Sequence, residues 1–310
     1  MDEVLGFLLR ERVEAVKDAS TTAFWARTAP LRARFSASVD RALSGGRAAD
    51  RLGYAFAAGY EAAVHALVPA LPTDCVAAFC VSEERGNHPR SITAELERTA
   101  AGWELSGEKR WSTMAPLSDT LIVVARTGTG EDGRPQLRAA VVDRGARGLT
   151  VTEMTPTPFV PEVPHAELVL DRVAIAGSAV LPGDGYDDYT KPFRTVEDVH
   201  VNAALLGYLL SAAARYGWPD PLLEKLAAAV VAVRGLATLD PRKAETHVAL
   251  AGLLDWVDSV AQLAEPAWTL VEDAERDRWY RDRVLTQVAS KARKLRRERA
   301  LATLRGESSG

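Results

Sequence analysis

The feature that most constrains this fold is a block of short β-rich segments between two helical stretches. From about residue 75 to 180, segments such as "CVAAFCVS" (75–82), "DTLIVVART" (119–127) and "HAELVLDRVAI" (165–175) are separated by Gly, Pro, Asp or Asn. Several short strands at close spacing predict an antiparallel barrel or sandwich. Since no Gly-x-Gly-x-x-Gly leads from a strand into a helix, we expect no Rossmann unit.

Helical periodicity dominates on both sides of this block. Val4 and Leu8 share a helix face near the start, and "SGG" at 44–46 predicts a break between helices. The helices predicted after the block cover 195–216, 221–239, 243–274, with a break at Pro266, and 276–304. The expected fold is α+β, with an N-terminal helical domain (1–73), a central antiparallel β-barrel or sandwich domain (74–182) and a C-terminal helical bundle (183–310).

Composition excludes several classes of protein. The 310 residues carry a net charge of −4, which argues against a protein built to hold nucleic acid. No run of 18 apolar residues and no signal peptide is present, so we expect a cytoplasmic protein with no membrane partner. The two cysteines, Cys75 and Cys80, have apolar neighbours and are interpreted as reduced core thiols. No metal site is expected.

One string in the β block combines a turn signal with two side chains suited to a ligand. In "LSGEKRWSTMA" (105–115), Gly107 to Lys109 has the composition of a turn, and Trp111 and Thr113 follow it two residues apart. On a strand, residues two apart point to the same face, as a shared ligand requires. The alternative is a half-buried Trp that closes the sheet, beside an ordinary strand Thr.

The order of elements and three strings together resemble the acyl-CoA dehydrogenase family of flavoproteins. The strings are "FCVSEERGNHP" (79–89), "GWELSGEKRWSTMAPLSDTLIVVART" (102–127) and "ELVLDRVAIAGSAVLPGDG" (167–185). The resemblance covers roughly residues 50 to 300 and implies FAD as cofactor. It implies that Trp111 packs on the isoalloxazine, that the Thr113 hydroxyl bonds near flavin N5, and that Ser82 replaces a threonine at the pyrimidine edge. The flavin-binding set that it implies is Phe79, Val81, Ser82, Trp111, Ser112 and Thr113.

Substrate contacts are also implied by the resemblance. Asn87 and His88 fall where the family has a serine that contacts the acyl thioester or the flavin, although the glycine there is shifted. Both side chains can donate a hydrogen bond. For His88, which precedes Pro89, an ordinary loop role is the alternative.

Dehydrogenation of an acyl thioester needs a carboxylate base that removes the α-proton. The late Tyr-Glu-Gly-Thr-like string that carries the base in most of the family is absent, and the family's last helices are expected to be missing. A minority of the family, which includes isovaleryl-CoA dehydrogenase, has the base on the first bundle helix, in a string similar to "RTVEDVHVNAALLGY" (194–208). Glu197 takes that position and shares a helix face with Val201, Ala204 and Tyr208. The alternative is helix capping, with Thr195 as N-cap and Asp198 at the third position.

The expected activity is α,β-dehydrogenation of an acyl-CoA or acyl-carrier-protein thioester by a homo- or hetero-oligomer, with an electron-transfer flavoprotein as one candidate acceptor. The nearest match to the family's pyrophosphate-binding Arg-x-x-Phe-Gly is "RYGW" (215–218), so the parts that hold the adenosine and pyrophosphate of FAD are altered or absent. The alternative function is therefore a non-catalytic or flavin-deficient subunit of a hetero-oligomeric complex. The basic stretch 291–299 is interpreted as a solvated helix face.

Overall fold

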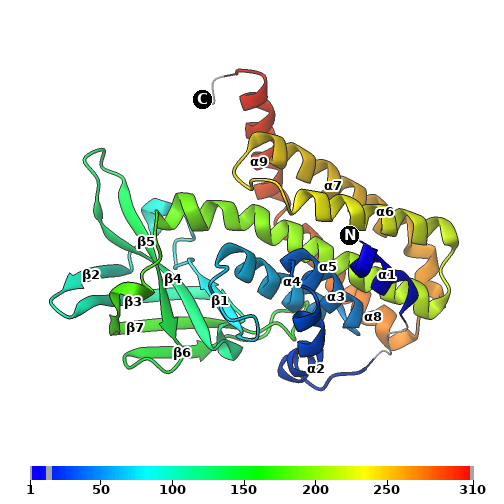
Figure 1. Cartoon of the computed structure of the whole chain (residues 1–310), viewed down its shortest axis with the longest axis horizontal. Helices are drawn as coiled ribbons and strands as arrows, with labels where there is room; N and C mark the ends of the chain where they lie inside the picture. The colour runs from blue at the N-terminus through cyan, green and yellow to red at the C-terminus, as the bar shows by residue number, and fades with distance from the viewer. Residues whose placement is uncertain (1, 12–15, 308–310) are drawn as a thin grey trace. The chain divides into compact units, whose positions relative to one another are not determined.

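The computed structural model describes residues 2–11 and 16–307, which form two compact units. The β unit comprises residues 67–156 and 163–194, and the helical unit comprises the chain up to residue 66, residues 157–162 and the chain from 195 onward. The elements of both units are labelled in Figure 1. The predicted α+β class, with helices before and after a curled sheet, is confirmed.

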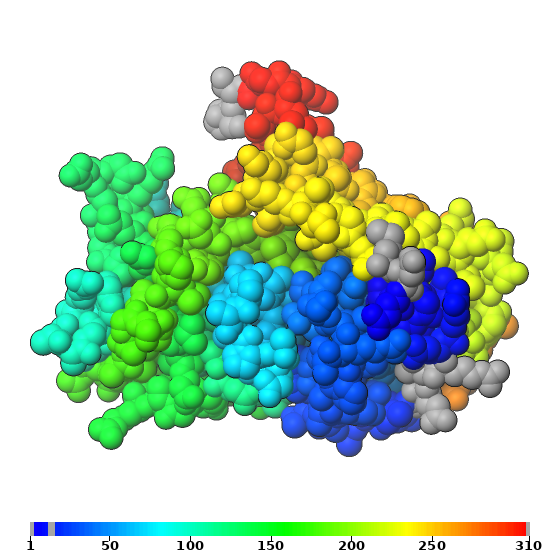
Figure 2. Space-filling model, viewed as in Figure 1, coloured from blue at the N-terminus to red at the C-terminus, as the bar shows by residue number. Residues whose placement is uncertain are grey.

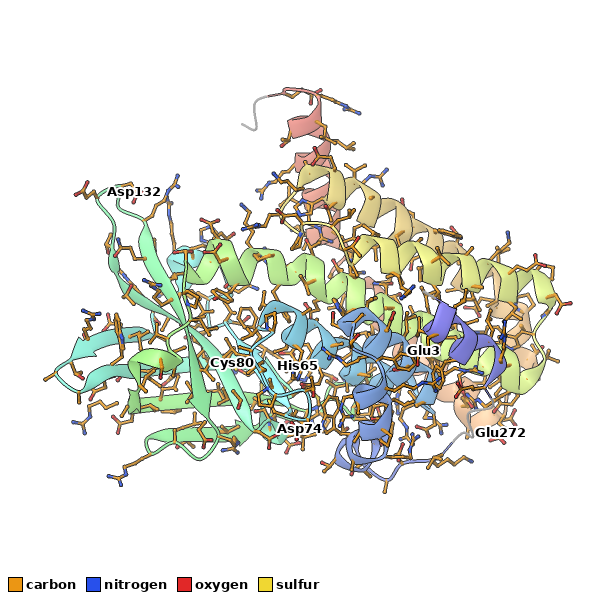
Figure 3. All side chains as sticks on the ribbon, in the orientation of Figure 1. Glu3, His65, Asp74, Cys80, Asp132 and Glu272 are labelled. Atoms are coloured by element: carbon orange, nitrogen blue, oxygen red, sulfur yellow. The ribbon has the colours of Figure 1, made fainter. Side chains whose placement is uncertain are left out.

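The β unit is one seven-stranded sheet. Its strands are β1 (Ala77–Cys80), β2 (Glu95–Thr99), β3 (Gly102–Thr113), β4 (Thr120–Thr129), β5 (Pro135–Asp143), β6 (Leu149–Glu153) and β7 (His165–Ile175). Their order is β1-β4-β2-β3-β7-β6, and β5 pairs with β4. Most pairs are antiparallel as predicted, but β1–β4 and β2–β4 are parallel. The hairpin of β4 and β5 reaches Asp132 at its tip, away from the rest of the sheet (Figure 3).

Short helical turns connect the strands and lead out of the sheet. They are 3-10 helices at Pro89–Ser91, Ala115–Leu117 and Gly177–Ala179, and a π-helical turn at Gly185–Thr190. The core of the unit is formed by alternate strand residues, such as Ala166, Leu168 and Leu170 of β7, which are buried. This alternation fixes which side chains of each strand are left outside the core.

The turn predicted at Gly107 to Lys109 is wrong, because β3 runs through these residues without a break. The β2–β3 turn lies earlier, before Gly102. Gly107 has φ +136°, and a Cβ on it would lie 2.6 Å from the Ala94 backbone. The glycine is therefore needed for a close approach of backbone inside the sheet.

Nine α-helices belong to the part of the chain that the structure describes. They are α1 (Asp2–Arg10), α2 (Thr21–Arg34), α3 (Ser38–Ala48), α4 (Leu52–Leu67), α5 (Lys191–Tyr216), α6 (Asp220–Leu236), α7 (Ala244–Leu263), α8 (Asp273–Asp282) and α9 (Ser290–Leu304). The predicted break at Pro266 is confirmed, as α7 ends at Leu263 and a 3-10 helix follows at Glu265–Leu270. The single helix predicted over 276–304 is wrong. Its first part ends at Asp282, whose buried carboxylate accepts the Val160 N–H, and a 3-10 helix at Arg283–Gln287 precedes α9.

The break predicted at 44–46 is also wrong, since α3 continues through these residues. A Cβ on Gly46 would lie 1.9 Å from the Ala204 carbonyl oxygen, and one on Gly45 would lie 2.6 Å from Ala58 Cβ. Gly207 of α5 meets the Leu43 carbonyl oxygen in the same way, at 2.1 Å. These glycines let α3 lie against its neighbours at short range, so they serve packing and not chain reversal.

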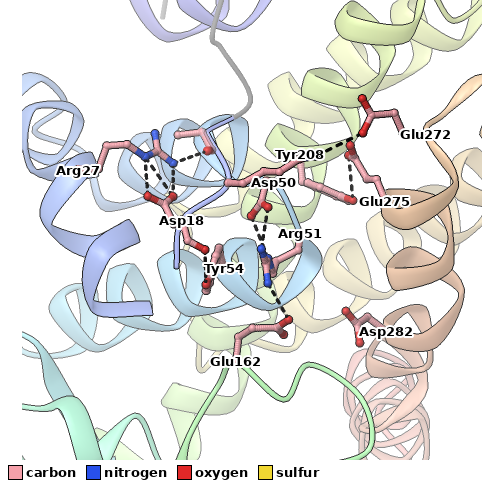
Figure 4. Close-up of polar contacts among 12 residues, drawn as sticks. Asp18, Arg27, Asp50, Arg51, Tyr54, Glu162, Tyr208, Glu272, Glu275 and Asp282 are labelled. Atoms are coloured by element: carbon pink, nitrogen blue, oxygen red, sulfur yellow. Dashed lines mark hydrogen bonds and ion pairs between the residues drawn. The ribbon is translucent and has the colours of Figure 1, made fainter. Parts of the chain in front are cut away.

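Residues 157–162, from the connection between β6 and β7, are held in the helical unit by ion pairs. Glu162 accepts from Arg51 and Arg281, each at 3.3 Å, and Arg51 also pairs with Asp50 at 2.9 Å (Figure 4). On another side of this unit α9 packs against α7, and its C-terminal part projects beyond it (red in Figure 2).

Candidate functional site

A buried ion pair forms the base of the candidate site in the β unit. The ammonium of Lys109 on β3, fully buried, lies 2.6 Å from a carboxylate oxygen of Glu83, which follows β1. The other Glu83 oxygen accepts from the N–H and hydroxyl of Thr93, at 2.7 and 2.6 Å. Burial alone would raise the pKa of Glu83, but the Lys109 charge and these hydrogen bonds hold it below its ordinary value. The pair therefore ties β3 to the segment that carries Ser82.

A β-bulge in β3 presents Trp111. In the pairing with β7, Lys109 faces Leu168 but Ser112 faces Ala166, so one extra residue is inserted between them. Lys109 and Ser112 are both buried although they are three apart, which a regular strand does not allow. Trp111 takes φ +55° and is 54% exposed. A bulky residue in the left-handed region costs about 1–3 kcal/mol, so the surrounding contacts must hold it there.

The bulge brings Ser82 and Thr113 to the same region as Trp111. The Arg110 N–H donates to the Ser82 carbonyl at 2.8 Å, and Thr113 pairs with His165. Ser82 and Thr113 are half-buried, and their hydroxyls have no hydrogen-bond partner among the described residues. Two hydroxyls with free hydrogen-bonding capacity thus accompany one exposed indole, an arrangement that suits a flat polar ring.

Two further members of the predicted flavin set, Phe79 and Val81, are buried in the β unit. Phe79 of β1 is buried and packs against Phe193, with ring centroids 4.7 Å apart. Val81 is buried, and its carbonyl accepts from the Lys109 ammonium at 3.3 Å. Cys80 is fully buried, and burial raises its pKa to about 12, in agreement with a reduced core thiol.

The two predicted substrate contacts lie in the exposed loop after β1. The Asn87 side-chain oxygen accepts from the Arg194 guanidinium at 2.8 Å. The His88 ring caps the 3-10 helix Pro89–Ser91 by accepting from the Arg90 N–H at 3.3 Å. His88 therefore performs the loop role that was its alternative, and a substrate contact of either residue stays a prediction.

Glu197 lies in the helical unit on α5, where the capping alternative for it is wrong. The helix begins at Lys191, after a π-helical turn capped by Asp184, so Thr195 is in the helix interior. The Thr195 hydroxyl is buried without a partner among the described residues. Asp198 does not cap either: its carboxylate is held by Arg293 at 2.7 Å and Arg296 at 2.5 Å from α9. Glu197 is half-buried in the interior of α5.

The arginine nearest to the family's pyrophosphate-binding position is engaged elsewhere. Both terminal nitrogens of Arg215 donate to Glu275, at 2.6 and 2.8 Å, and the Tyr216 hydroxyl donates to the same carboxylate at 2.9 Å. Both charged groups are largely buried. In this arrangement the guanidinium stabilises the packing of α5 against α8, and its forked donors are not available to a phosphate.

Glu83, Lys109 and His165 contribute to the site and were not predicted. A lysine two residues before a candidate ligand-binding Trp gives no signal of burial, because the bulge that turns it inward is not visible in the sequence. Among the described residues no cluster of His, Cys, Asp or Glu is suited to a metal ion. Nor is any described helix long and apolar enough to cross a bilayer.

Comparison with known proteins identifies the class that this fold and site define. Residues 78–173, from the second residue of β1 to Val173 of β7, match the family model "Acyl-CoA dehydrogenase, middle domain". This match places residues 78–173 in the acyl-CoA dehydrogenase middle-domain family, and the rest of the chain shares its fold with solved structures such as butyryl-CoA dehydrogenase of Megasphaera elsdenii.

Individual relatives are distant. Benzylmalonyl-CoA dehydrogenase of Aromatoleum aromaticum is 29% identical over 48% of this chain and 40% of its own length. Cyclohexane-1-carbonyl-CoA dehydrogenase of Geobacter metallireducens is 26% identical over 72% of this chain and 66% of its own. The solved FMN-bound TdsC of Paenibacillus sp. A11-2 superposes with a TM-score of 0.67 at 17% identity, covering 94% of each chain. The chain thus spans less than half the length of benzylmalonyl-CoA dehydrogenase. At 17% identity, the similarity to TdsC supports the fold alone.

Proposed function

We propose that this chain acts as a flavin-dependent dehydrogenase that removes hydrogen from the α and β carbons of an acyl thioester. The observation that carries the proposal is the exposed Trp111 indole, which the bulge holds in a strained conformation beside the free hydroxyls of Ser82 and Thr113. A strained, exposed aromatic residue on an otherwise regular strand is typical of a ligand site. The substrate named for both curated relatives is a CoA thioester.

The proposed seat takes the isoalloxazine ring of FAD. Trp111 stacks on the ring, and the hydroxyls of Thr113 and Ser82 donate to its polar edge, while Phe79, Val81 and Ser112 form the wall of the seat. When bound, the flavin supplies the acceptor for the substrate's β-hydride. Because Arg215 is paired with Glu275, we propose that the ring half of the cofactor contributes more to its affinity than the pyrophosphate.

Glu197 is proposed as the base that takes the α-proton. The helix starts six residues before it, so its carboxylate is not used as a cap, and it shares a helix face with Val201, Ala204 and Tyr208. Ala204 and Tyr208 are buried, and Val201 is half-buried. A half-buried carboxylate that shares a helix face with apolar side chains is suited to the role of a general base. Asn87 and His88 remain the proposed contacts to the thioester.

The acyl carrier is proposed to be CoA or a carrier protein. The electron acceptor is proposed to be an electron-transfer flavoprotein, and the assembly a homo- or hetero-oligomer. The experiment on the catalytic proposal does not depend on the acyl carrier, the electron acceptor or the oligomeric state.

The test begins with the purified full chain and added FAD or FMN. Flavin that co-purifies or binds is measured by its visible absorbance, and anaerobic addition of an acyl-CoA should bleach it. In Glu197→Gln the flavin should stay bound, and the rate of bleaching should fall by about 10²- to 10⁴-fold. The control is Asp187→Asn, which removes an exposed carboxylate from the turn before α5 and should leave the rate unchanged.

Two results would contradict the proposal. Protein that takes up neither flavin has no dehydrogenase activity of this type and would favour the non-catalytic subunit. Bleaching at the wild-type rate in Glu197→Gln would remove Glu197 from the role of base.

A further inference from the structure

The half-buried His165 is the aromatic neighbour of Trp111. It is the first residue of β7 and pairs with Thr113 across the strands. Its imidazole stands nearly perpendicular to the indole, with ring centroids 5.8 Å apart and planes at 73°. Such edge-to-face contacts are a preferred geometry for aromatic pairs and restrict the rotation of both rings.

The backbone around His165 is fixed from both sides. The Met114 N–H donates to the Pro164 carbonyl, and the Met154 N–H donates to the His165 carbonyl, each at 2.8 Å. Next to Trp111 in the chain, Arg110 forms an ion pair with Glu167 at 2.7 Å. The His165 imidazole is thus an aromatic contact that restricts rotation of the exposed Trp111 ring.

We propose that His165 is a positioning residue that holds the Trp111 indole in the orientation in which it stacks on the flavin ring. This inference rests on the proposed flavin-binding function. It assigns to His165 no proton transfer and no contact with substrate. This role requires a flat ring at position 165. An uncharged ring disturbs the neighbouring Trp111 indole least.

The surroundings of His165 keep its ring neutral at pH 7. Burial lowers its pKa below the ordinary value, although a hydrogen bond from the ring to the Val163 carbonyl opposes the change. The charged groups at neighbouring strand positions are Arg110 and Glu167, which pair with each other, and Glu153 of β6, which lies opposite Ala166 of β7. Protonation in acid would place a cation against the indole and change its environment.

The first arm of the test observes the indole without flavin. The chain has seven tryptophans, so the full-length protein is labelled with 5-fluorotryptophan, and the Trp111 ¹⁹F resonance is assigned by its absence in Trp111→Phe. We expect it to move and narrow in His165→Ala and to keep its position in His165→Phe, which retains the ring. In the wild type it should shift with pH at a midpoint below the ordinary His value, and this titration should be missing in His165→Phe. Val169→Ala, at an exposed position of the same strand, should change neither spectrum nor titration.

The second arm measures flavin affinity by quenching of flavin fluorescence. His165→Ala should weaken binding by roughly threefold to tenfold, the contribution of one aromatic pair, and His165→Phe should bind close to wild type. Loss of fold is excluded by circular dichroism spectra of the variants that equal the wild-type spectrum at the assay temperature.

The outcomes separate this inference from the proposed function. An unchanged Trp111 resonance in His165→Ala overturns the inference even if the wild type binds flavin. A moved resonance with unchanged flavin affinity overturns the role in flavin binding. Wild-type protein that binds no flavin sinks the proposed function, and the fluorine spectra still decide whether His165 holds the indole.

Discussion

The buried pair of Glu83 and Lys109 offers the sharpest test of how the β unit supports the site. In Lys109→Met the side chain keeps its approximate length and loses its charge, while Glu83 stays in place with its hydrogen bonds from Thr93. The carboxylate is then buried without a counter-charge. Replacing one partner of a buried pair is expected to cost about 3–5 kcal/mol, because the remaining charge is uncompensated.

The magnitude follows from burial. Lys109 is fully buried and the Glu83 side chain is 6% exposed, so solvent screens the pair very little. For a unit the size of the β unit, 1 kcal/mol corresponds to about 4 °C in Tm, so Lys109→Met should lower the midpoint by about 12–20 °C. The matched control is Arg110→Met. It breaks the adjacent Arg110–Glu167 pair, in which both side chains are more than 40% exposed, and should cost less than about 1 kcal/mol.

The dependence on pH distinguishes a charge effect from loss of packing. In the wild type the folded pKa of Glu83 is depressed, so its stabilisation is present above the unfolded value of about 4.3 and is lost as pH falls through the folded pKa. In Lys109→Met burial is opposed only by the hydrogen bonds from Thr93 and Ala94 and no longer by a charge, so the folded pKa of Glu83 should exceed the unfolded value. The variant then loses stability as pH rises through that folded pKa, and its deficit should be larger at pH 8 than at pH 5.

The assay is urea unfolding at pH 5 and pH 8, followed by circular dichroism and by tryptophan fluorescence. The double variant Glu83→Gln with Lys109→Met removes both charges and should recover much of the loss. A deficit in Lys109→Met no larger than in Arg110→Met, or one independent of pH, would refute the argument that the pair is an ionic anchor of the site.

Three further outcomes are expected. Gly46→Ala should destabilise the helical unit by about 1–3 kcal/mol or more, because the added Cβ meets the backbone of Ala204. Its control, Gly252→Ala, has open space around the added Cβ and should stabilise α7 by about 0.5–1 kcal/mol. Equal midpoints of the two variants in thermal melts would argue against the close helix contact. Asp198→Ala leaves two arginines of α9 without their carboxylate and should cost about 1–3 kcal/mol in urea unfolding, with no loss if that contact is absent in solution. In the folded protein at pH 8 a thiol reagent should modify Cys75 and spare Cys80, whose pKa is raised to about 12; modification of both within minutes would contradict its burial.

Much of the architecture was predictable because it depends on local patterns. Alternating apolar residues define the strands, helical periodicity defines α5 to α7, and Pro266 ends a helix wherever the chain goes. The wrong predictions at the glycines share one cause. Gly45, Gly46 and Gly107 have the composition of turn or break signals, but each is required by a neighbouring backbone or Cβ atom that only the folded chain brings close.

The candidate site likewise combines features that the sequence predicts with features that only the folded chain decides. The residue types of Trp111, Thr113 and Ser82 and the family resemblance were readable in the sequence, and the resemblance is confirmed over residues 78–173. Membership does not by itself show a residue's role, so the assignments of Glu197, Asn87 and His88 stay predictions. The structure removed the capping explanation for Glu197, because helix α5 starts four residues before Thr195.

The sequence by itself determined the order of elements, the family resemblance and the side chains available for chemistry, since these depend on periodicity, turn residues and short strings. Only the tertiary structure decided that Lys109 is buried, that Trp111 is turned outward and that His165 stands beside it. The physical reason is the bulge in β3. One inserted residue changes the face of every side chain beyond it, and the pairing with β7 that places the insertion joins residues more than fifty positions apart.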